Sequence, residues 1–192
     1  MSRPHWADRD PEQSSRARSA RKPSIRYPSL VTEVLGEGRF LRLVRQGRWE
    51  FVERVRTAGV VAMVAVTGDG ELLLIEQTRP AIGGAQIELP AGLVDEGEDF
   101  RAAARRELME ETGFSAERFE PLGEAAPSSG LSSEVITFYA AHRVHRVEEG
   151  GGTDGEDITV HLVPLSEVRA WLAAQAAAID MKVYAGLFLA RL

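Results

Sequence analysis

The sequence predicts an α/β fold in which a mixed β-sheet is covered by helices on both faces and is preceded by a β meander. Short apolar strands are interleaved with three helical segments, and two of the strands are apolar nearly throughout. Such strands are typical of a sheet that is buried on both faces. The 192 residues, 44% of them hydrophobic, fit one globular domain with an additional element rather than two full domains.

Residues 1–28 are predicted to be a disordered basic tail. Residues 1–26 contain seven Lys/Arg and three Asp/Glu, a net charge of +4, which leaves the rest of the chain at −10. A polar composition with interspersed prolines is typical of segments that do not fold. Binding of an anionic partner and an Arg- and Ser-rich targeting role are the alternatives. The acidic remainder argues against nucleic-acid binding, which relies on a basic face.

Residues 29–56 are predicted to form a β region with three short strands. The stretches "SLVTEVL", "RFLRLVR" and "RWEFVERV" are rich in aromatic and β-branched residues, and "RQGR" predicts a turn between the last two. Residues 57–192 form the main domain. Its stretches "VVAMVAV" (60–66) and "ELLLIEQ" (71–77), joined by the tight turn "TGDG", are predicted to form the centre of the sheet.

The remaining elements follow in chain order. A Gly-rich loop leads to a short strand "IELPAG" and then to a helix that Gly113 ends as its C-terminal cap. A strand at 135–142, an acidic, Gly-rich loop at 147–157 that we expect to be mobile, and a strand at 158–165 come next. Ser166 and Asp180 are the predicted N-caps of the last two helices.

The helix before Gly113 carries three glutamates close to its C-terminal end. Winding residues 99–112 at about 100° per residue places Glu107, Glu110 and Glu111 on the same stripe as the apolar side chains. The residues predicted to face the other side are Arg101, Arg105 and Thr112. A solvated charged face would lie opposite the apolar stripe, so this is not the pattern of an ordinary surface helix.

Three costs oppose this placement of charge. Like charges three and four residues apart each destabilise a helix by about 0.2–0.5 kcal/mol, and the negative end of the helix dipole and desolvation add to this. Hard divalent cations offset these costs, because Mg²⁺ and Mn²⁺ prefer oxygen ligands. The chain has no cysteine, so a metal must be held by carboxylate, imidazole or carbonyl groups. The helix therefore predicts a site for Mg²⁺, with Mn²⁺ as the alternative.

The same stretch, "GLVDEGEDFRAAARRELMEETGF" (92–114), contains a longer pattern, G-x5-E-x7-R-E-U-x-E-E-x-G-U, where U is apolar. Its fixed positions are Gly92, Glu98, Arg106, Glu107, Leu108, Glu110, Glu111, Gly113 and Phe114. This pattern resembles the signature of the Nudix hydrolases. The resemblance implies an α/β/α sandwich and a metal-dependent hydrolysis of a nucleoside diphosphate linked to another group.

The resemblance also implies roles for individual residues. Glu107, Glu110, Glu111 and the backbone carbonyl of Ala91 would be the metal ligands, and Arg106, held by Glu98, would orient the loop and the helix. A general base must accept the proton of the attacking water. In some members of the family the base lies within the signature. In the ADP-ribose pyrophosphatases it is a Glu on a loop beyond the signature, where "SSGLSSE" places Glu134.

The flanking sequence resembles the ADP-ribose and nucleotide-sugar branch of the family. In "EQTRPAIGGAQIELPAGLVDEGE", Arg79 would contact a phosphate or ribose, and "AIDMKVYAGLFLA" is similar to the last helix of that branch. One departure is "SSG" at 128–130, where the ADP-ribose enzymes have "SPG". The expected reaction is ADP-ribose to AMP and ribose 5-phosphate. The alternatives are a GDP-mannose or other nucleotide-sugar pyrophosphatase, a dinucleoside polyphosphate or RNA-cap hydrolase, and a non-catalytic nucleotide sensor.

The resemblance extends to the β region at residues 29–56, because members of this branch use it to complete the base pocket of a second subunit. Trp49, Phe51 and Arg54 would then contact the base, and the protein would be a homodimer. The alternative is a meander that only covers the sheet edge. No uncharged apolar run approaches the ~20 residues of a membrane span, and the N-terminus lacks an apolar signal region, so we expect a cytoplasmic protein without a membrane partner.

Overall fold

The computed structural model describes residues 31–152 and 157–192, so the predicted basic tail and part of the acidic loop lie outside the described residues. The N-terminal strands are Thr32–Glu37 (β1), Leu41–Gln46 (β2) and Trp49–Arg54 (β3). The later strands are Gly59–Thr67 (β4), Glu71–Arg79 (β5), Gly84–Glu88 (β6), Ala91–Val94 (β7), Phe114–Ser115 (β8), Arg118–Ala125 (β9), Ile136–Arg146 (β10), Ile158–Pro164 (β11) and Ala178–Ile179 (β12). The helices are Phe100–Thr112 (α1), Val168–Ala173 (α2) and Met181–Ala190 (α3), with a short 3₁₀ turn at Pro80–Ile82.

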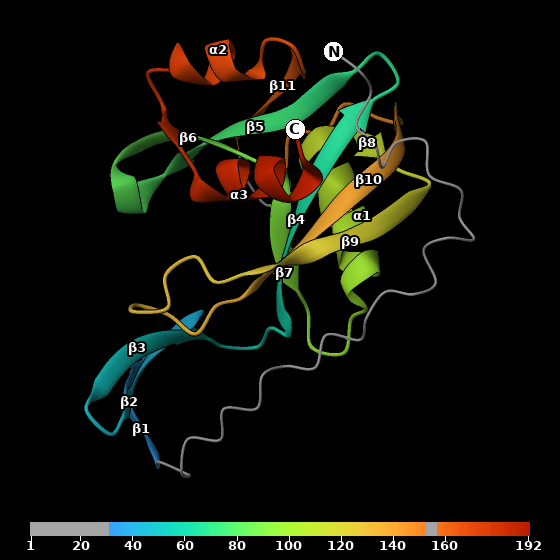
Figure 1. Cartoon of the computed structure of the whole chain (residues 1–192). Coiled ribbons are helices and arrows are strands. Elements are labelled where there is room, and N and C mark those ends of the chain that lie inside the picture. The colour runs from blue at the N-terminus through green and yellow to red at the C-terminus, as the bar shows by residue number, and fades with distance from the viewer. Residues whose placement is uncertain (1–30, 153–156) are drawn as a thin grey trace.

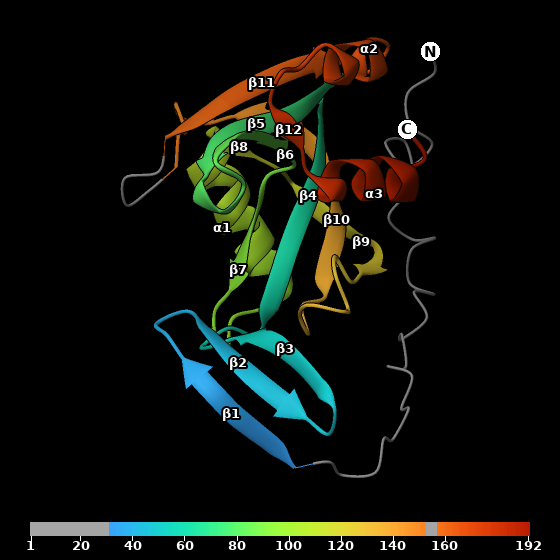
Figure 2. The ribbon, with the colours of Figure 1, turned by 90° about the vertical axis from the view of Figure 1, so that its left-hand side faces the viewer.

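The main sheet consists of two halves that meet at the β4–β5 turn. β4 lies between β10, which runs parallel to it, and β7, whereas β5 lies between β6 and β11. β4 and β5 pair with each other only at Val66 and Leu72, beside the turn, and then separate (Figure 2). Both strands are central, as predicted, but each lies at the centre of its own half of the sheet. β4 pairs mainly with β10 and β7, and β5 pairs mainly with β6 and β11.

Helices cover both faces of the sheet, which confirms the predicted α/β/α sandwich (Figure 1). Alternate residues of β4 point to opposite faces. Ala62 and Val64 belong to the cluster that includes Val183 of α3, whereas Val61 and Met63 belong to the cluster that includes the apolar side chains of α1. The glutamates of α1 and the first turn of α3 therefore approach the sheet from opposite sides.

Local signals account for the helix ends. Oδ1 of Asp99 accepts the N–H groups of Arg101 and Ala102 at the start of α1, and Gly113 ends it with a left-handed φ of 73°, as predicted. Asp180 caps α3, also as predicted. The prediction for Ser166 is wrong: Glu167 occupies the N-cap position of α2 without a side-chain bond. The reason is a tight turn after β11, in which the Glu167 N–H donates to the Pro164 carbonyl (2.8 Å). Because of this turn, α2 begins only at Val168.

Two strand predictions also differ from the structure. The single strand expected at "IELPAG" is two strands, β6 and β7, because Pro90 between them has no N–H to donate to a sheet. β9 was not predicted, since Pro121 and Gly123 interrupt its apolar pattern. Both are tolerated because, among the described strands, β9 pairs with β10 alone and carries a register shift at this point.

The strands β1–β3 form a separate antiparallel sheet within the predicted segment 29–56, and it projects from one end of the main body (Figure 1). Val52 joins it to the body: its N–H donates to the Leu131 carbonyl (2.9 Å), and its carbonyl accepts from the Ser133 N–H (3.1 Å). Within β1–β3 only Val44 is fully buried. In the described part of the chain, no helix has the length and apolar character needed to cross a membrane.

Candidate active site

A cavity of ≈ 380 Å³ lies where β4 begins, β5 ends and β7 begins. Its lining includes eight of the residues that the sequence singled out: Arg54, Arg79, Ala91, Arg106, Glu107, Glu110, Glu111 and Glu134. These residues are spread over about 80 positions of the chain, so the fold brings them together. The cavity lies at the end of the sheet away from the β4–β5 turn, where the two halves have separated.

Gly92 makes room for the first glutamate. A Cβ atom at Gly92 would lie 1.9 Å from Cδ of Glu107, which no side chain can tolerate. β7 pairs with β4 at this point, with Gly92 opposite Val61, so the strand cannot move aside. The glycine is therefore required by the close approach of strand and carboxylate rather than by its backbone conformation.

Arg106 connects two glutamates of α1 to the loop before the helix. Its Nε and Nη2 donate to the two carboxylate oxygens of Glu98 at 3.1 and 3.0 Å, and Nη2 also donates to the Leu93 carbonyl. Nη1 donates to Glu107 at 2.8 Å and to Glu110 at 3.3 Å. The pairing with Glu98 raises the pKa of Arg106, and Arg106 in turn lowers the pKa of Glu98. The guanidinium thus remains charged and holds the carboxylates in place.

The C-terminal end of α1 is closed by the loop 147–152. Gly151 and Gly152 donate their backbone N–H groups to the carbonyls of Glu111 and Glu110, at 3.1 and 3.0 Å. Such donors offset the negative end of the helix, where carboxylates are otherwise unfavourable. Glu111 is buried, and its Oε2 accepts the N–H of Ala91 at 2.9 Å.

The same loop explains a correction. Thr112 was predicted to face away from the core, but it is fully buried. The periodicity of α1 predicts which side chains face the sheet, but it does not show that the loop 147–152 covers the opposite side of the helix. The contact is very close, since a Cβ on Gly150 would lie 2.2 Å from the carbonyl carbon of Thr112.

The donor set suits a hard divalent cation. Three carboxylates within one and a half turns of helix, together with a nearby carbonyl at Ala91, offer only oxygen ligands, which Mg²⁺ and Mn²⁺ prefer. Across residues 31–152 and 157–192, the acidic and histidine side chains do not converge into a ready three-ligand cluster. The Arg106 guanidinium supplies the positive charge beside Glu107 and Glu110.

A second group of charges borders the cavity, and sequence reasoning found only one member of it. Arg79 pairs with Glu88, which is fully buried at the end of β6, and Lys182 pairs with Glu88 and with Asp180. The available signal was Glu88 itself, a charged residue inside the apolar stretch "IELPAG". Lys182 gave no signal, because a lysine in the first turn of a helix is common.

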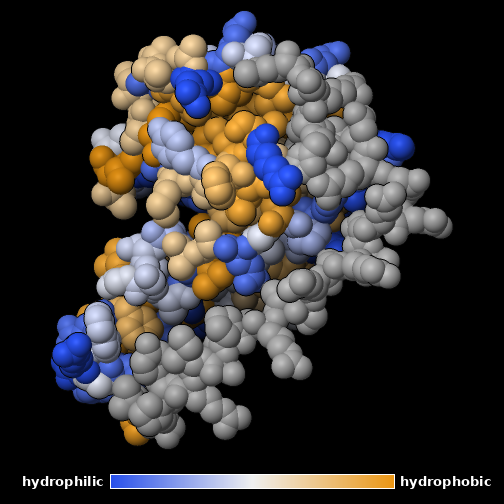
Figure 3. All heavy atoms as spheres, viewed as in Figure 1, coloured by the Kyte–Doolittle hydropathy of each residue, from blue (hydrophilic) through white to orange (hydrophobic). Residues whose placement is uncertain are grey.

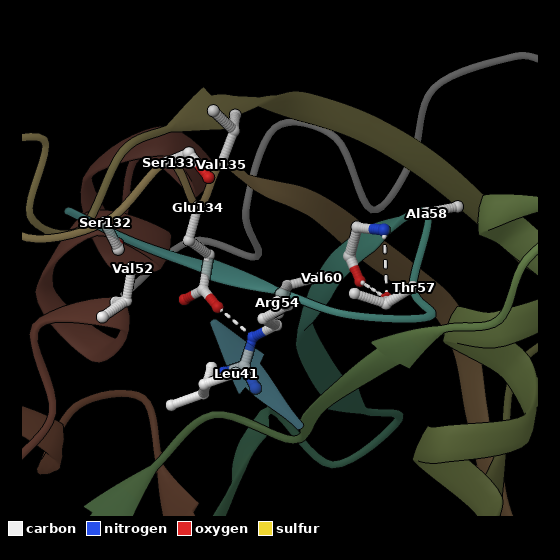
Figure 4. A pocket seen from close by; sticks show the side chains of 11 residues that line it. Leu41, Val52, Arg54, Thr57, Ala58, Val60, Ser132, Ser133, Glu134 and Val135 are labelled. Atoms are coloured by element: carbon white, nitrogen blue, oxygen red, sulfur yellow. Dashed lines mark hydrogen bonds and ion pairs between the residues drawn. The ribbon is translucent and has the colours of Figure 1, made fainter. Parts of the chain in front are cut away.

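A second cavity of ≈ 440 Å³ lies between the β1–β3 sheet and the body, and it shares Arg54 and Glu134 with the first (Figure 4). The Nε of Arg54 donates to Oε2 of Glu134 in a short ion pair across this cavity. Trp49 and Phe51 line neither cavity. Alternation along β3 places them on the face opposite Arg54, and Trp49 is 60% exposed.

The chain combines an α/β/α sandwich with a cavity lined by carboxylates and arginines, an arrangement suited to the metal-dependent hydrolysis of phosphate anhydrides. The family model described as the NUDIX domain matches residues 55–187. The chain therefore belongs to the Nudix family and is a Nudix pyrophosphohydrolase of the branch that contains the ADP-ribose pyrophosphatases. Nudix hydrolases generally use divalent metal ions.

Individual proteins resemble the chain to different extents. The chain is 35% identical over 144 residues to a methanol dehydrogenase activator of Bacillus methanolicus, covering 72% of this chain and 77% of that protein. It is 31% identical over 105 residues to an ADP-ribose pyrophosphatase of Bacillus subtilis, covering 55% of this chain and 57% of that protein. The crystal structure of an ADP compounds hydrolase matches with a TM-score of 0.65 and 22% identity, covering 84% of this chain and 90% of that one, and shows the likeness of fold.

Proposed function

We propose that the protein hydrolyses ADP-ribose to AMP and ribose 5-phosphate in the presence of Mg²⁺. The observation that supports this most is the cavity in which Glu107, Glu110 and Glu111 lie together with cationic groups, because a diphosphate requires both metal ligands and positive side chains. The similarity to an ADP-ribose pyrophosphatase supports the choice of substrate. We expect the reaction to take place in the cytoplasm.

When bound, the divalent cation neutralises the diphosphate and lowers the pKa of a water molecule. Glu107, Glu110, Glu111 and the Ala91 carbonyl would hold it, with Arg106 fixing the first two carboxylates. Glu134 accepts the proton of the attacking water as the general base. In this structure Arg54 pairs with Oε2 of Glu134, and this ion pair holds the carboxylate at the cavity.

We further propose a homodimer in which Trp49 and Phe51 complete the base pocket of the second subunit. Their position supports this, since they lie outside both cavities of their own chain, and Trp49 is exposed on the β1–β3 sheet. Aromatic side chains bury a large area at low entropic cost and are enriched at interfaces and in base pockets. Arg54, on the other face of β3, would serve its own subunit.

A nucleotide sugar such as GDP-mannose is the second candidate substrate, and "SSG" at 128–130 in place of "SPG" favours it. Dinucleoside polyphosphates and capped RNA are lesser alternatives. A sensor that binds nucleotide without cleaving it is a different class of protein, and the similarity to a Bacillus methanolicus protein named as an activator favours it. The complete set of signature glutamates favours catalysis instead.

The test is to incubate the full-length protein with ADP-ribose or GDP-mannose and Mg²⁺, with and without EDTA, and to separate the nucleotide products by chromatography. We expect chelator-sensitive AMP from ADP-ribose. GMP from GDP-mannose alone would retain the chemistry and change the substrate. No product from either, with tight binding of ADP-ribose, would refute catalysis in favour of the sensor.

A further inference from the structure

The last turn of α1 carries two of the expected metal ligands at the point where a helix is least stable. Glu110 and Glu111 lie just before Gly113, the C-cap residue. The last carbonyls of a helix have no partner within it, and helix ends fray for this reason. Repulsion between neighbouring carboxylates and the negative end of the helix dipole oppose winding further. The three glutamates lie together only while this turn is wound, so a preformed metal site needs support from outside the helix.

The loop 147–152 gives this support with its backbone. Gly151 donates its N–H to the Glu111 carbonyl at 3.1 Å, and Gly152 donates to the Glu110 carbonyl at 3.0 Å. Two more N–H groups of the loop donate to the carbonyl of Gly113, at 2.8 and 3.1 Å. Four hydrogen bonds therefore join the loop to the end of the helix, and two of them go to residues whose side chains are expected metal ligands.

Three consecutive glycines allow the loop to come this close. The φ angles of Gly150, Gly151 and Gly152 are 75°, 115° and 87°, which L side chains rarely adopt. A Cβ at Gly150 would lie 2.2 Å from the carbonyl carbon of Thr112 and 2.3 Å from the backbone nitrogen of Gly113. Glycine is thus required at position 150 both by the backbone conformation and by the close approach of loop and helix.

The loop is also attached to the strand that precedes it. Arg146, the last residue of β10, donates from Nε to the Glu148 carbonyl (3.1 Å) and from Nη2 to the Glu149 carbonyl (3.3 Å). Its guanidinium lies 5.6 Å from the centroid of the Phe114 ring, and Phe114 itself pairs with Arg146 in the sheet. The backbone donors of the loop are therefore held beside the end of α1, which lowers the entropy that they lose on binding it.

We propose that the loop 147–152 is a positioning element of the metal site, in which Gly150, Gly151 and Gly152 hold the last turn of α1 wound before the metal binds. The proposal rests on the proposed function only for the use of a divalent metal. Docking of the loop and binding of the metal both require the wound turn, so each strengthens the other. Loss of the loop contacts therefore weakens metal binding and leaves the chemistry of the loaded site intact.

The test is the binding of Mn²⁺ to the full-length protein without nucleotide, measured by electron paramagnetic resonance of the free ion. In Gly150→Ala the new Cβ displaces the loop from the helix. We expect the Kd for Mn²⁺ to rise about tenfold, a usual result of losing a group that orients metal ligands. Hydrolysis should need about tenfold more Mg²⁺ for its half-maximal rate, with kcat at saturating Mg²⁺ changed by less than about threefold. Unchanged Mn²⁺ affinity in a folded Gly150→Ala protein would overturn the proposal.

The matched control is Gly70→Ala, in the turn between β4 and β5. Gly70 has a φ of 81°, close to the 75° of Gly150, but nothing lies within 4 Å of its Cβ position. The two variants therefore carry similar backbone strain, and only Gly150→Ala displaces the loop. We expect Gly70→Ala to have a lower melting temperature but the Mn²⁺ affinity of the unchanged protein. Equal losses of Mn²⁺ affinity in both variants would overturn the proposal, since a general loss of stability would explain them.

If Gly150→Ala does not fold, Arg146→Met decides. Arg146 is exposed, and methionine keeps an apolar chain beside Phe114 while removing the two bonds to the loop carbonyls. We expect Mn²⁺ binding to weaken several-fold, because the loop is then less firmly held against the helix. Mn²⁺ binding as tight as in the unchanged protein would contradict the proposal.

Hydrogen exchange of the unchanged protein tests the same coupling from the other side. The amides of Gly151 and Gly152 should exchange more slowly in Mg²⁺ than in EDTA, because the metal stabilises the turn to which they bond. Equal exchange in the two conditions, or no Mn²⁺ binding by the unchanged protein, overturns the proposal. Mn²⁺ binding that depends on the loop, without hydrolysis of any nucleotide, would refute only the proposed function. Hydrolysis with Mn²⁺ binding that ignores the loop would refute only this inference.

Discussion

The main body and the N-terminal sheet of this protein bury their apolar residues very differently. The body, residues 57–192, has an apolar cluster on each face of its sheet. In the sheet β1–β3, Val44 alone is fully buried, whereas Val34, Leu43 and Trp49 are 40–60% exposed. The body therefore holds the glutamates and cations that it contributes to the cavity in place without help from a second subunit. The sheet has little core of its own, and we expect it to be stabilised by a second subunit.

The largest expected effect concerns the acidic side of the cavity in the body. Glu111→Gln keeps the shape and an acceptor for the Ala91 N–H but removes the charge. We expect kcat to fall about 10³-fold, because the charge needed for metal binding is lost. The melting temperature should not fall, since repulsion among the glutamates is relieved. A steady-state assay and a thermal melt check this, and Glu117→Gln, an exposed residue outside the cavity, is the control. Full activity in Glu111→Gln would contradict the metal assignment.

A pair of glycine substitutions compares the two regions directly. In Gly92→Ala, the new Cβ would meet the Glu107 carboxylate at 1.9–2.2 Å, so the carboxylate must move. We expect activity to fall about 10²-fold, as for a displacement of about 1 Å in a catalytic group. In Gly36→Ala, on β1, nothing lies within 4 Å of the new Cβ, and we expect no change. Equal kcat/KM values for the two variants would show that close packing at Gly92 does not position Glu107.

A third prediction tests whether the β1–β3 sheet forms the interface of the proposed homodimer. We expect Trp49→Glu to shift the protein from dimer to monomer and to raise KM for ADP-ribose about tenfold, the scale of an interface aromatic. Phe188→Glu is the matched control, because Phe188 is even more exposed (82%) on α3, where apolar residues gather on the surface of the body (Figure 3). Light scattering after size exclusion measures both. A monomer from Phe188→Glu, with Trp49→Glu still a dimer, would move the interface to α3.

The smallest expected effect is a pH dependence that belongs to the body alone. Burial lowers the pKa of His142 below its usual 6.5, and its ring lies between Arg118 and Glu120. The unfolded chain therefore binds more protons than the folded one as the pH falls below about 6.5, and the free energy of unfolding decreases there. Urea unfolding over a range of pH measures this. His142→Gln should remove this part of the slope, and an unchanged slope would assign it to other groups.

Most of the acidic side of the site was predictable, because one helix carries it. Spacing along α1 places Glu107, Glu110 and Glu111 on the core-facing stripe, and this follows from helical geometry alone. Gly113 and Asp180 were equally local signals, since each acts through its own backbone and the residues next to it. Ser166 failed as a cap because a turn after β11, set by the packing of that strand, determines where α2 begins.

The sequence by itself determined the family through the resemblance of its signature, the two-sided sandwich through the order of its strands and helices, and the stripe of glutamates through the helical period. Only the tertiary structure decided what faces that stripe. Glu88 and Lys182 are 94 positions apart, and the loop that buries Thr112 returns from beyond β10. The physical reason is that a buried charge or a close backbone contact is satisfied by whichever segment the fold brings to it, and periodicity within one element does not record that partner.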